Sequence, residues 1–252
     1  MNACRAVGIE PESRETPAEL AGRTASFDWA AIERDLFDQG HAGIPGLLDA
    51  QTCRDLAALY DQESLFRSRI VMARHGYGSG EYRYFADPLP AVVSELRESL
   101  YLGLAKVADR WNEALRITRR YPADLAAFRA QCQAAGQTRP TPLLLRYEAG
   151  DYNRLHQDIY GEHVFPLQVV ILLSEPGRDF TGGEFVLTEQ RARMQSRAEV
   201  VNLAQGDATI FAVRERPVCG PRGAARAVLR HGVSRVRSGL RYTLGIIFHD
   251  AA

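Results

Sequence analysis

The sequence predicts an α+β fold: a mostly β core of the double-stranded β-helix (jelly roll) type, packed against N-terminal helices. Before residue 140 the apolar residues recur at helical spacing, whereas after it the chain consists of short β-rich runs that Gly, Pro, Asn or Asp separate. Many short strands at regular spacing are typical of a sandwich or jelly roll. We therefore expect a flexible N-terminus (1–24), a helical N-terminal region (25–139) and a double-stranded β-helix domain (140–252).

The helical region is expected to contain four helices. Residues 28–39 and 49–60 each place apolar side chains on one helical face, and a longer apolar stripe runs over 89–115. A fourth helix is expected over 122–136, because this segment opens with Pro and closes with Gly. Residues 74–90 are rich in Gly, Tyr and Arg, and we expect a long loop or a short hairpin there.

The strands of the second half are expected in seven β-rich runs. They are LLLRY (143–147), FPLQVVILL (165–173), GGEFVLTE (182–189), AEVVNL (198–203), ATIFAV (208–213), RAVLRHGVSRV (226–236) and LRYTLGIIFH (240–249). Gly, Pro, Asn or Asp residues lie between these runs, as is typical of the turns that connect the strands of a jelly roll.

Composition excludes several classes of protein. No stretch approaches the ~20 apolar residues that a membrane-spanning helix needs, and the N-terminus lacks the apolar region of a signal peptide. We therefore expect a cytoplasmic protein without a membrane partner. The four cysteines show no CxxC spacing, which favours free thiols over a zinc site or a disulfide framework.

Charge is unevenly distributed although the net charge is zero. Residues 178–241 hold 12 Arg against 6 Asp and Glu, and the rest of the chain is correspondingly acidic. One interpretation is attraction to a polyanion such as nucleic acid. The other is a solvated surface in an arginine-biased protein, since Lys106 is the only lysine.

A candidate metal site lies at His156-Gln157-Asp158 with His231 downstream. His156 and Asp158 are two residues apart, so they point to the same side of an extended segment. Two imidazoles and one carboxylate are the facial triad of non-haem Fe(II) oxygenases. An isolated HxD tripeptide also arises by chance, and His249 is a rival for the second histidine.

Arg241 and Thr243 share a face of the last predicted strand, ten and twelve residues after His231. A guanidinium fork beside a hydroxyl is a good receptor for a carboxylate. We interpret the pair as the anchor of a 2-oxoglutarate cosubstrate. The alternative is a surface arginine on an edge strand.

Together these residues resemble the Fe(II)/2-oxoglutarate-dependent dioxygenase superfamily, whose fold is the double-stranded β-helix. The segments RYEAG (146–150) and LHQD (155–158) are similar to the strand and metal loop of AlkB-type nucleic-acid dealkylating dioxygenases. In those enzymes a tyrosine nine residues before the first histidine contacts 2-oxoglutarate, which implies that role for Tyr147. Two positions depart from that pattern: Leu145 replaces an Asn, and Ile247 replaces a second Arg.

Other segments resemble the prolyl-hydroxylase-like branch, namely GGEF (182–185), GD (206–207) and the ten-residue interval from His231 to Arg241. The whole stretch from about 139 to 250 looks like a bacterial oxygenase family that acts on alkylated DNA. This resemblance implies an oxidoreductase that uses Fe(2+), 2-oxoglutarate and O2 to repair DNA alkylation damage by oxidative dealkylation. A hydroxylase of a protein side chain or a small molecule, and an idle jelly roll that only binds a partner, are the alternatives.

Residues on the substrate side are predicted from chemistry alone. Tyr82 and Tyr84 are candidates to stack on a base, and Arg83 to meet phosphate. Glu184 and Arg191 are candidates to line the mouth of the site. Aromatic side chains that anchor a loop, and solvated strand ends, explain the same residues equally well.

Overall fold

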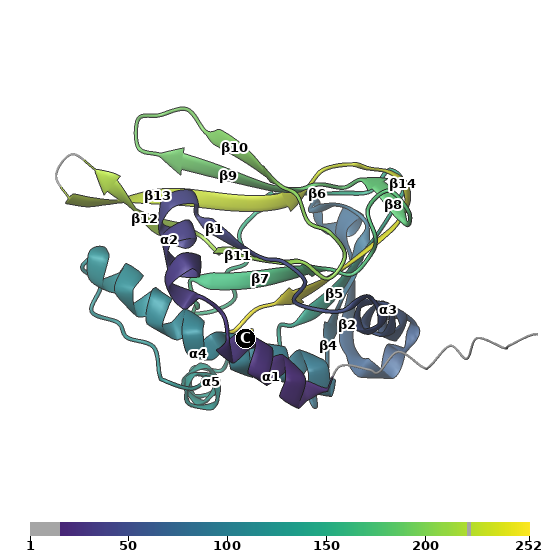
Figure 1. The fold of residues 1–252 in the computed structure, drawn as a ribbon, viewed down its shortest axis with the longest axis horizontal. Helices are drawn as coiled ribbons and strands as arrows, with labels where there is room; N and C mark the ends of the chain where they lie inside the picture. The colour runs from purple at the N-terminus through teal and green to yellow at the C-terminus, as the bar shows by residue number, and fades with distance from the viewer. Residues whose placement is uncertain (1–15, 221–222) are drawn as a thin grey trace, which may run out of the picture.

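The computed structural model describes residues 16–220 and 223–252, which fold into two facing antiparallel sheets with helices against one of them (Figure 1). The larger sheet has the strand order β1 (His41–Ile44), β11 (Ala208–Ala212), β7 (Leu167–Leu172), β14 (Val236–Ile246), β5 (Leu143–Glu148), β4 (Glu81–Phe85) and β2 (Phe66–Val71), and β8 (Phe180–Gly182) also pairs with β14. The smaller sheet has the order β10 (Arg197–Val201), β9 (Phe185–Arg191), β13 (Gly223–Val233), β6 (Tyr152–His156) and β3 (Gly78–Ser79), and β12 (Glu215–Gly220) pairs with β13. The predicted jelly-roll core is confirmed.

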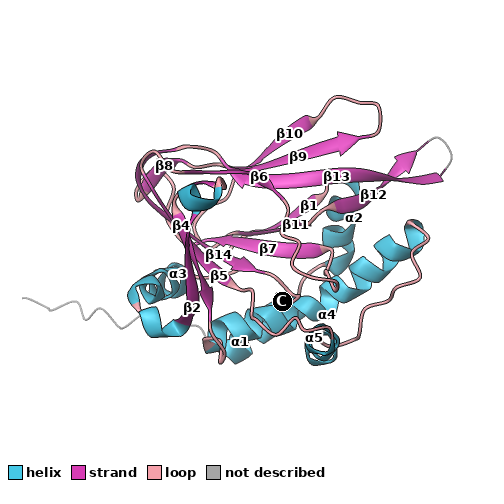
Figure 2. Ribbon diagram, turned by 180° about the vertical axis from the view of Figure 1, so that it is seen from behind, coloured by secondary structure: helices cyan, strands magenta, loops and turns pink. Residues whose placement is uncertain are grey.

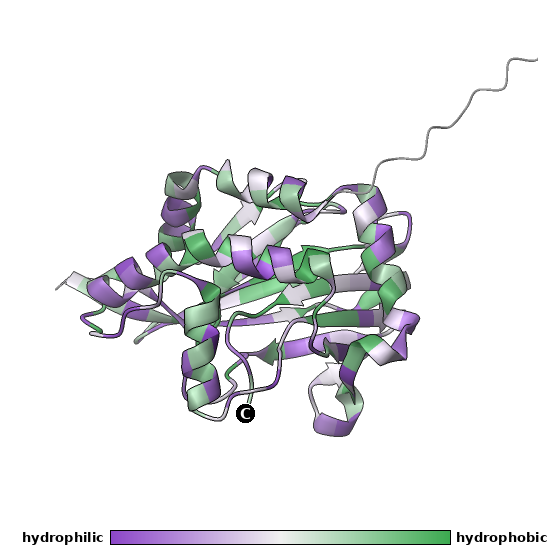
Figure 3. Cartoon of the chain, turned by 90° about the horizontal axis from the view of Figure 1, so that it is seen from below, coloured by the Kyte–Doolittle hydropathy of each residue, from purple (hydrophilic) through white to green (hydrophobic). Residues whose placement is uncertain are grey.

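The helices cover the outer face of the larger sheet (Figure 2). They are α1 (Pro17–Ala25), α2 (Trp29–Gln39), α3 (Ala50–Ala58), α4 (Ala91–Ala114) and α5 (Leu125–Ala134). Three short 3-10 turns lie in the connections between elements, namely η1 (Leu59–Asp61), η2 (Glu63–Leu65) and η3 (Met72–His75). In Figure 3 polar and apolar residues alternate along these helices, as expected where one face is buried. Leu96, Leu100 and Leu104 of α4 form one core with Leu144 and Ile246 of the sheet.

The predicted helix ends agree with the capping chemistry at most positions. Asp49 accepts a hydrogen bond from Thr52 N and starts α3, and Gly40 ends α2 in the left-handed conformation at φ 85°. The fourth helix begins later than the expected position 122, because Asp124 is its N-cap and accepts from Ala127 N. A side chain that caps the backbone determines this start more strongly than a proline two residues earlier.

The expectation of a flexible segment 1–24 is wrong for its last part, because α1 begins at Pro17. Thr16 and Glu19 form a reciprocal capping box, and Leu20 is fully buried against the core. Residues 1–15 lie outside the described residues.

The region 25–139 is more than helical, because it supplies strands to both sheets. β1 pairs with β11, and β4 joins β2 to β5, so residues from before and after position 140 share the larger sheet. The segment 74–90, expected as a loop or hairpin, contains β3 and β4. Strand pairing across such sequence distances leaves no local signal.

Two expectations from composition can be compared with the structure. Cys53, Cys132 and Cys219 form no disulfide bond among the described residues, and Cys4 lies outside them. Over the part of the chain that the structure describes, no helix is both long and apolar enough to cross a membrane.

Candidate metal centre

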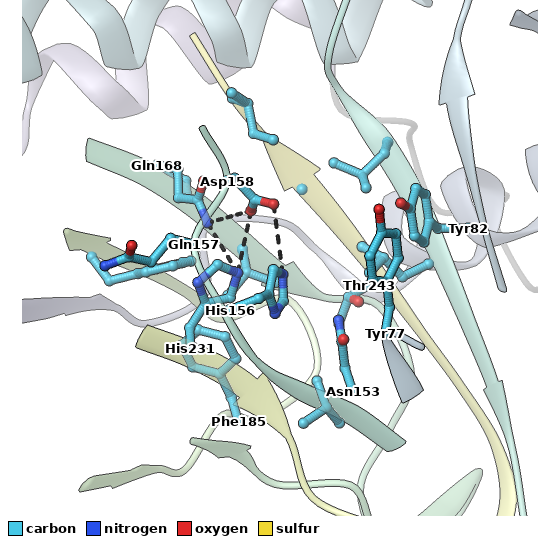
Figure 4. A pocket seen from close by; sticks show the side chains of 18 of the residues that line it. Tyr77, Tyr82, Asn153, His156, Gln157, Asp158, Gln168, Phe185, His231 and Thr243 are labelled. Atoms are coloured by element: carbon cyan, nitrogen blue, oxygen red, sulfur yellow. Dashed lines mark hydrogen bonds and ion pairs between the residues drawn. The ribbon is translucent and has the colours of Figure 1, made fainter. Parts of the chain in front are cut away.

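His156, Asp158 and His231 meet at the inner face of the smaller sheet (Figure 4). His156 ends β6, and its Cα partner on β13 is His231, so strand pairing places the two imidazoles side by side with ring centroids 4.1 Å apart. Asp158 follows β6 and reaches back: its Oδ1 lies 3.6 Å from His156 Nε2 and its Oδ2 lies 3.3 Å from His231 Nε2. One ligand atom from each residue lies within 4.8 Å of the others.

The electrostatics of this cluster favour a cation. Burial alone would raise the pKa of Asp158, but the hydrogen bond to His231 and the two histidines hold that pKa far below its ordinary value. Burial lowers the pKa of His231, with the neighbouring His156 acting in the same direction. An ionised carboxylate beside a neutral imidazole is the protonation state that a divalent metal requires of its ligands.

Two residues that sequence reasoning missed hold the carboxylate in place. Tyr160 donates to Asp158 Oδ1 at 2.6 Å, and Gln168 Nε2 donates to Asp158 Oδ2 at 3.0 Å. Gln168 Nε2 also lies 3.2 Å from His231 Nε2, and its Oε1 is buried without a partner among the described residues. Gln168 had a usable signal, because it is the one polar residue in the apolar run FPLQVVILL.

Arg241 lies in the same cavity as the triad and is almost completely buried. Its guanidinium carbon is 5.7 Å from the ring centroids of both Tyr147 and Phe180, while Nε and Nη1 have no hydrogen-bond partner in the part of the chain that the structure describes. Burial lowers the pKa of Arg241 to about 10, so it remains charged at neutral pH. Buried donors without a partner are costly, which indicates that an anionic ligand satisfies them.

Glycine makes room for this side chain. A Cβ at Gly183 would lie 2.9 Å from Arg241 Cδ, and Gly183 has a φ of +65°. Thr243 is buried two residues after Arg241 and also lines the cavity, as does Tyr147, whose hydroxyl receives a hydrogen bond from Asn153 Nδ2 at 3.3 Å. The three residues expected around 2-oxoglutarate are therefore brought together.

The cavity has a volume of about 310 Å³ and a tyrosine wall opposite the triad. Tyr77 and Tyr82 stand across the cavity from His156 and His231 (Figure 4). Tyr84 lines the cavity too, and its hydroxyl contacts that of Tyr160 at 3.1 Å. Of the predicted substrate-side residues, Tyr82 and Tyr84 are thus beside the metal site.

Arg83 and Arg191 do not line this cavity. Successive residues of a strand face opposite sides, so Tyr82 and Tyr84 point inward and Arg83 points away. Its guanidinium packs over the Tyr60 ring at 4.7 Å and pairs with Glu63. Arg191 pairs with a neighbouring glutamate on β9.

Glu184 lies beside a second, adjoining cavity that it shares with Arg241. Ser234 donates a short hydrogen bond to its carboxylate, and this bond lowers the pKa of Glu184. The rival histidine, His249, is buried outside the triad cluster and accepts a hydrogen bond from Phe165 N at 3.3 Å. His231 is therefore the second imidazole of the cluster.

The donor set fits a resident metal and cosubstrate. Two imidazoles and one carboxylate on one side leave the remaining positions to face the cavity, and the unpaired edge of Arg241 offers a site for a carboxylate within the same space. A His-Asp-His site in this fold fits Fe(2+), with 2-oxoglutarate and O2 as cosubstrates.

The fold is that of the 2-oxoglutarate- and Fe(II)-dependent oxygenases. A prolyl hydroxylase from Trichoplax adhaerens, solved with a peptide of hypoxia inducible factor, superposes with a TM-score of 0.54 at 15% identity over 94% of each chain. An oxidoreductase of the 2OG-Fe(II) oxygenase family from Burkholderia pseudomallei gives 0.51 at 19% identity, covering 90% of this chain and 94% of that one. A Pseudomonas putida prolyl-4-hydroxylase gives 0.50 at 17% identity, covering 89% and 99%.

The particular family follows from the sequence itself. Residues 80–251 match the model of a family described as "Oxygenase, catalysing oxidative methylation of damaged DNA". Two uncharacterized proteins from two strains of Mycobacterium tuberculosis are each 51% identical over 168 residues, which is 67% of this chain and 72% of theirs. The chain belongs to this oxygenase family and is an oxidoreductase.

Proposed function

We propose that this protein is an Fe(II)- and 2-oxoglutarate-dependent dioxygenase that removes alkyl groups oxidatively from damaged DNA bases. The observation that carries the chemistry is the meeting, in one cavity, of the His156, Asp158 and His231 cluster with the unpaired guanidinium of Arg241. The description of the matching family supports damaged DNA as the substrate.

Each residue has a role in this proposal. His156, Asp158 and His231 hold the iron, and Arg241 with Thr243 binds the far carboxylate of 2-oxoglutarate while Tyr147 closes that end of the cavity. Together, the bound metal and cosubstrate supply the oxidant that hydroxylates a C–H bond. The protein contributes orientation, exclusion of water and the tyrosine wall that faces the substrate.

The direction of the proposed reaction is removal of the methyl group. Hydroxylation of an N-methyl group gives a hemiaminal, which loses formaldehyde and leaves the unmodified base. Because the triad lies inside a cavity, a base must leave the duplex stack or be single-stranded to reach it.

Hydroxylation of a protein side chain or a small molecule is the competing function. The ten residues from His231 to Arg241 are the spacing of the hydroxylase branch, and this feature favours it. The two functions differ in the product that they release, since only the demethylation yields formaldehyde from a methylated base.

The test is turnover of iron-loaded protein with methylated single-stranded and duplex oligonucleotides, with formaldehyde and restored bases as readouts. The expected result is 2-oxoglutarate-dependent restoration that is lost in His156→Ala. Arg178→Ala, a change at an exposed side chain paired with Glu175, is the control and should retain turnover. Turnover of peptides with no reaction on any methylated oligonucleotide would replace the DNA substrate by a protein one.

A further inference from the structure

Exposed apolar side chains are concentrated at the mouth of the metal cavity. Over the described residues, the large apolar side chains with the highest exposure are Tyr77, Leu102, Leu155, Ile159, Met194 and Val200. Three of these six, namely Tyr77 at 50%, Leu155 at 46% and Ile159 at 41%, belong to two adjoining segments around the metal loop. Tyr77 and Ile159 line the cavity itself. Exposed apolar side chains that lie together mark a binding surface more often than single, scattered ones do.

A β-bulge explains why this part of β6 faces outward. His231 pairs with His156, but Val233 pairs with Asn153, so β6 has one residue more than β13 in this interval. As a result, Asn153 and His156 line the cavity while Arg154 and Leu155 are both exposed.

Gly232 of β13 permits the close approach of this bulge. A Cβ at Gly232 would lie 2.7 Å from Asn153 O, and 3.3 Å from Arg154 C and from Arg154 O. The backbones of β13 and β6 are therefore in close contact at the bulge. This contact fixes the direction in which the side chains of Arg154 and Leu155 project.

One arginine side chain without a partner among the described residues accompanies the apolar ones. Arg154 and Arg230 are exposed, and neither side chain has a hydrogen bond or ion pair with any residue in the described ranges. Arg154 N donates to Tyr77 O at 2.8 Å, which places this arginine beside the exposed tyrosine. Arg230 directly precedes His231 on β13, so its side chain points to the opposite face of the sheet from the metal site. Elsewhere on β12 and β13, by contrast, Arg226 is paired with Glu215.

The Tyr77 ring is held in a fixed orientation by a neighbour. Its ring stacks on that of His75, with centroids 5.3 Å apart and an interplanar angle of 22°. Half of the tyrosine nevertheless remains exposed. A flat ring supported from one side and open on the other is suited to stack on a planar ligand.

We propose that Tyr77, Arg154, Leu155 and Ile159, here called the rim, dock a single-stranded stretch of nucleic acid across the cavity mouth. One base stacks on Tyr77, Leu155 and Ile159 cover apolar faces of its neighbours, and Arg154 contacts a phosphate. Aromatic platforms combined with unpaired cations are how proteins bind single strands without reading sequence. The inference rests on the proposed function, because it supplies the substrate strand to the same cavity.

The experiment measures binding of a fluorescent, unmethylated oligothymidine by anisotropy, with the metal-free protein and without 2-oxoglutarate. Tyr77→Ala is expected to weaken binding about fivefold or more, since each base–aromatic stack contributes at least this factor. For Arg154→Gln, the slope of log K against log salt should fall by about 0.7, because one single-strand phosphate contact accounts for about this amount.

Two control variants have matched chemistry on the helical layer. Arg34→Gln removes an exposed charge from α2, and Leu102→Ala removes an apolar side chain that is 52% exposed on α4. Both are expected to bind the oligonucleotide as the unmodified protein does. Thermal unfolding of every variant separates a lost contact from a lost fold.

The outcomes separate the rim from the proposed function. If the protein restores methylated bases but the rim variants bind and turn over oligonucleotides normally, the rim proposal is overturned and the function stands. If the protein neither binds nor demethylates nucleic acid, both fail. If the rim variants instead raise KM for a peptide substrate, the rim is a peptide-docking surface and the nucleic-acid proposal is wrong.

Discussion

Asp158 accepts a hydrogen bond on each of its two carboxylate oxygens, one from Tyr160 and one from Gln168. A carboxylate with both oxygens engaged has a fixed orientation before any metal arrives. Partners of this kind orient metal ligands, and their loss commonly reduces metal affinity 10- to 100-fold. Tyr160 and Gln168 therefore position Asp158, and in the proposed function the triad would make the metal contacts.

Tyr160→Phe is expected to weaken metal binding by about tenfold or more, because only the hydroxyl that donates to Asp158 is removed. Calorimetric titration of the metal-free protein with Fe(II) under anaerobic conditions measures it. Tyr101→Phe is the matched control, since it deletes a hydroxyl that donates to Pro122 O far from the triad. Equal metal affinity in the two variants would show that Asp158 needs no support from Tyr160.

Arg241→Ala is expected to raise the Kd for 2-oxoglutarate by about one to two orders of magnitude. Hydrogen bonds to charged groups contribute roughly 1.5–3 kcal/mol each, and the unpaired Nε and Nη1 of Arg241 are buried where a carboxylate can reach them. Anaerobic titration of 2-oxoglutarate into metal-loaded protein gives the value directly. An unchanged Kd would remove Arg241 from the cosubstrate site.

Local spacing was sufficient to predict some site residues and insufficient for others. His156 and Asp158 are two residues apart, and so are Arg241 and Thr243. Residues two apart on an extended strand point to the same side, so each pair could be predicted from spacing alone. By the same alternation, Arg83 should point away from the cavity that Tyr82 and Tyr84 line. The structure agrees, because the Arg83 guanidinium packs over the Tyr60 ring instead. The role of Asn153 depends on the bulge in β6, which no local pattern reveals.

At the scale of elements, the metal site depends on the pairing of β6 with β13. These strands are far apart in sequence, so the contact between His156 and His231 is set by register and not by spacing. A shift of one residue would turn His231 to the outer face. The sequence predicted a strand over 226–236, which contains His231, but only an extended segment at His156 and Asp158. It contained no information about which residues would pair.

Leu20→Ala tests whether α1 is part of the folded core. Leu20 is fully buried and α1 packs against α4, so the change is expected to lower the free energy of unfolding by about 2–5 kcal/mol. Urea unfolding gives the value. Leu102→Ala on α4 is the control, because this leucine is 52% exposed and should cost much less. Equal, small effects would indicate that α1 contributes little to stability.

Across the whole molecule, a second group of buried polar residues adjoins the metal cavity without lining it. The triad and Arg241 lie between the sheets, whereas Arg97, Asp250 and His249 are buried where the C-terminal end of the chain meets the helices. Arg97 pairs with Asp250 at 2.6 Å, which compensates both buried charges. His249 Nε2 has no such partner among the described residues.

This buried histidine makes stability depend on pH. Burial lowers the pKa of His249 from its ordinary 6.5 to about 4; Asp158 and Asp250 act against the shift, and Arg97 acts with it. Between these two pH values the unfolded chain binds a proton that the folded protein does not. His249 therefore stabilises the fold fully above pH 6.5, and this contribution is lost as pH falls toward 4, by about 3 kcal/mol in all.

His249→Asn is expected to flatten the acid side of the stability profile, because asparagine does not titrate and can still accept the hydrogen bond from Phe165 N. Urea unfolding of metal-free protein at several pH values between 4 and 7 measures both profiles. The difference in slope should approach that of one proton, about 1.4 kcal/mol per pH unit. Parallel profiles would mean that His249 is protonated in the folded protein or not buried as the structure shows.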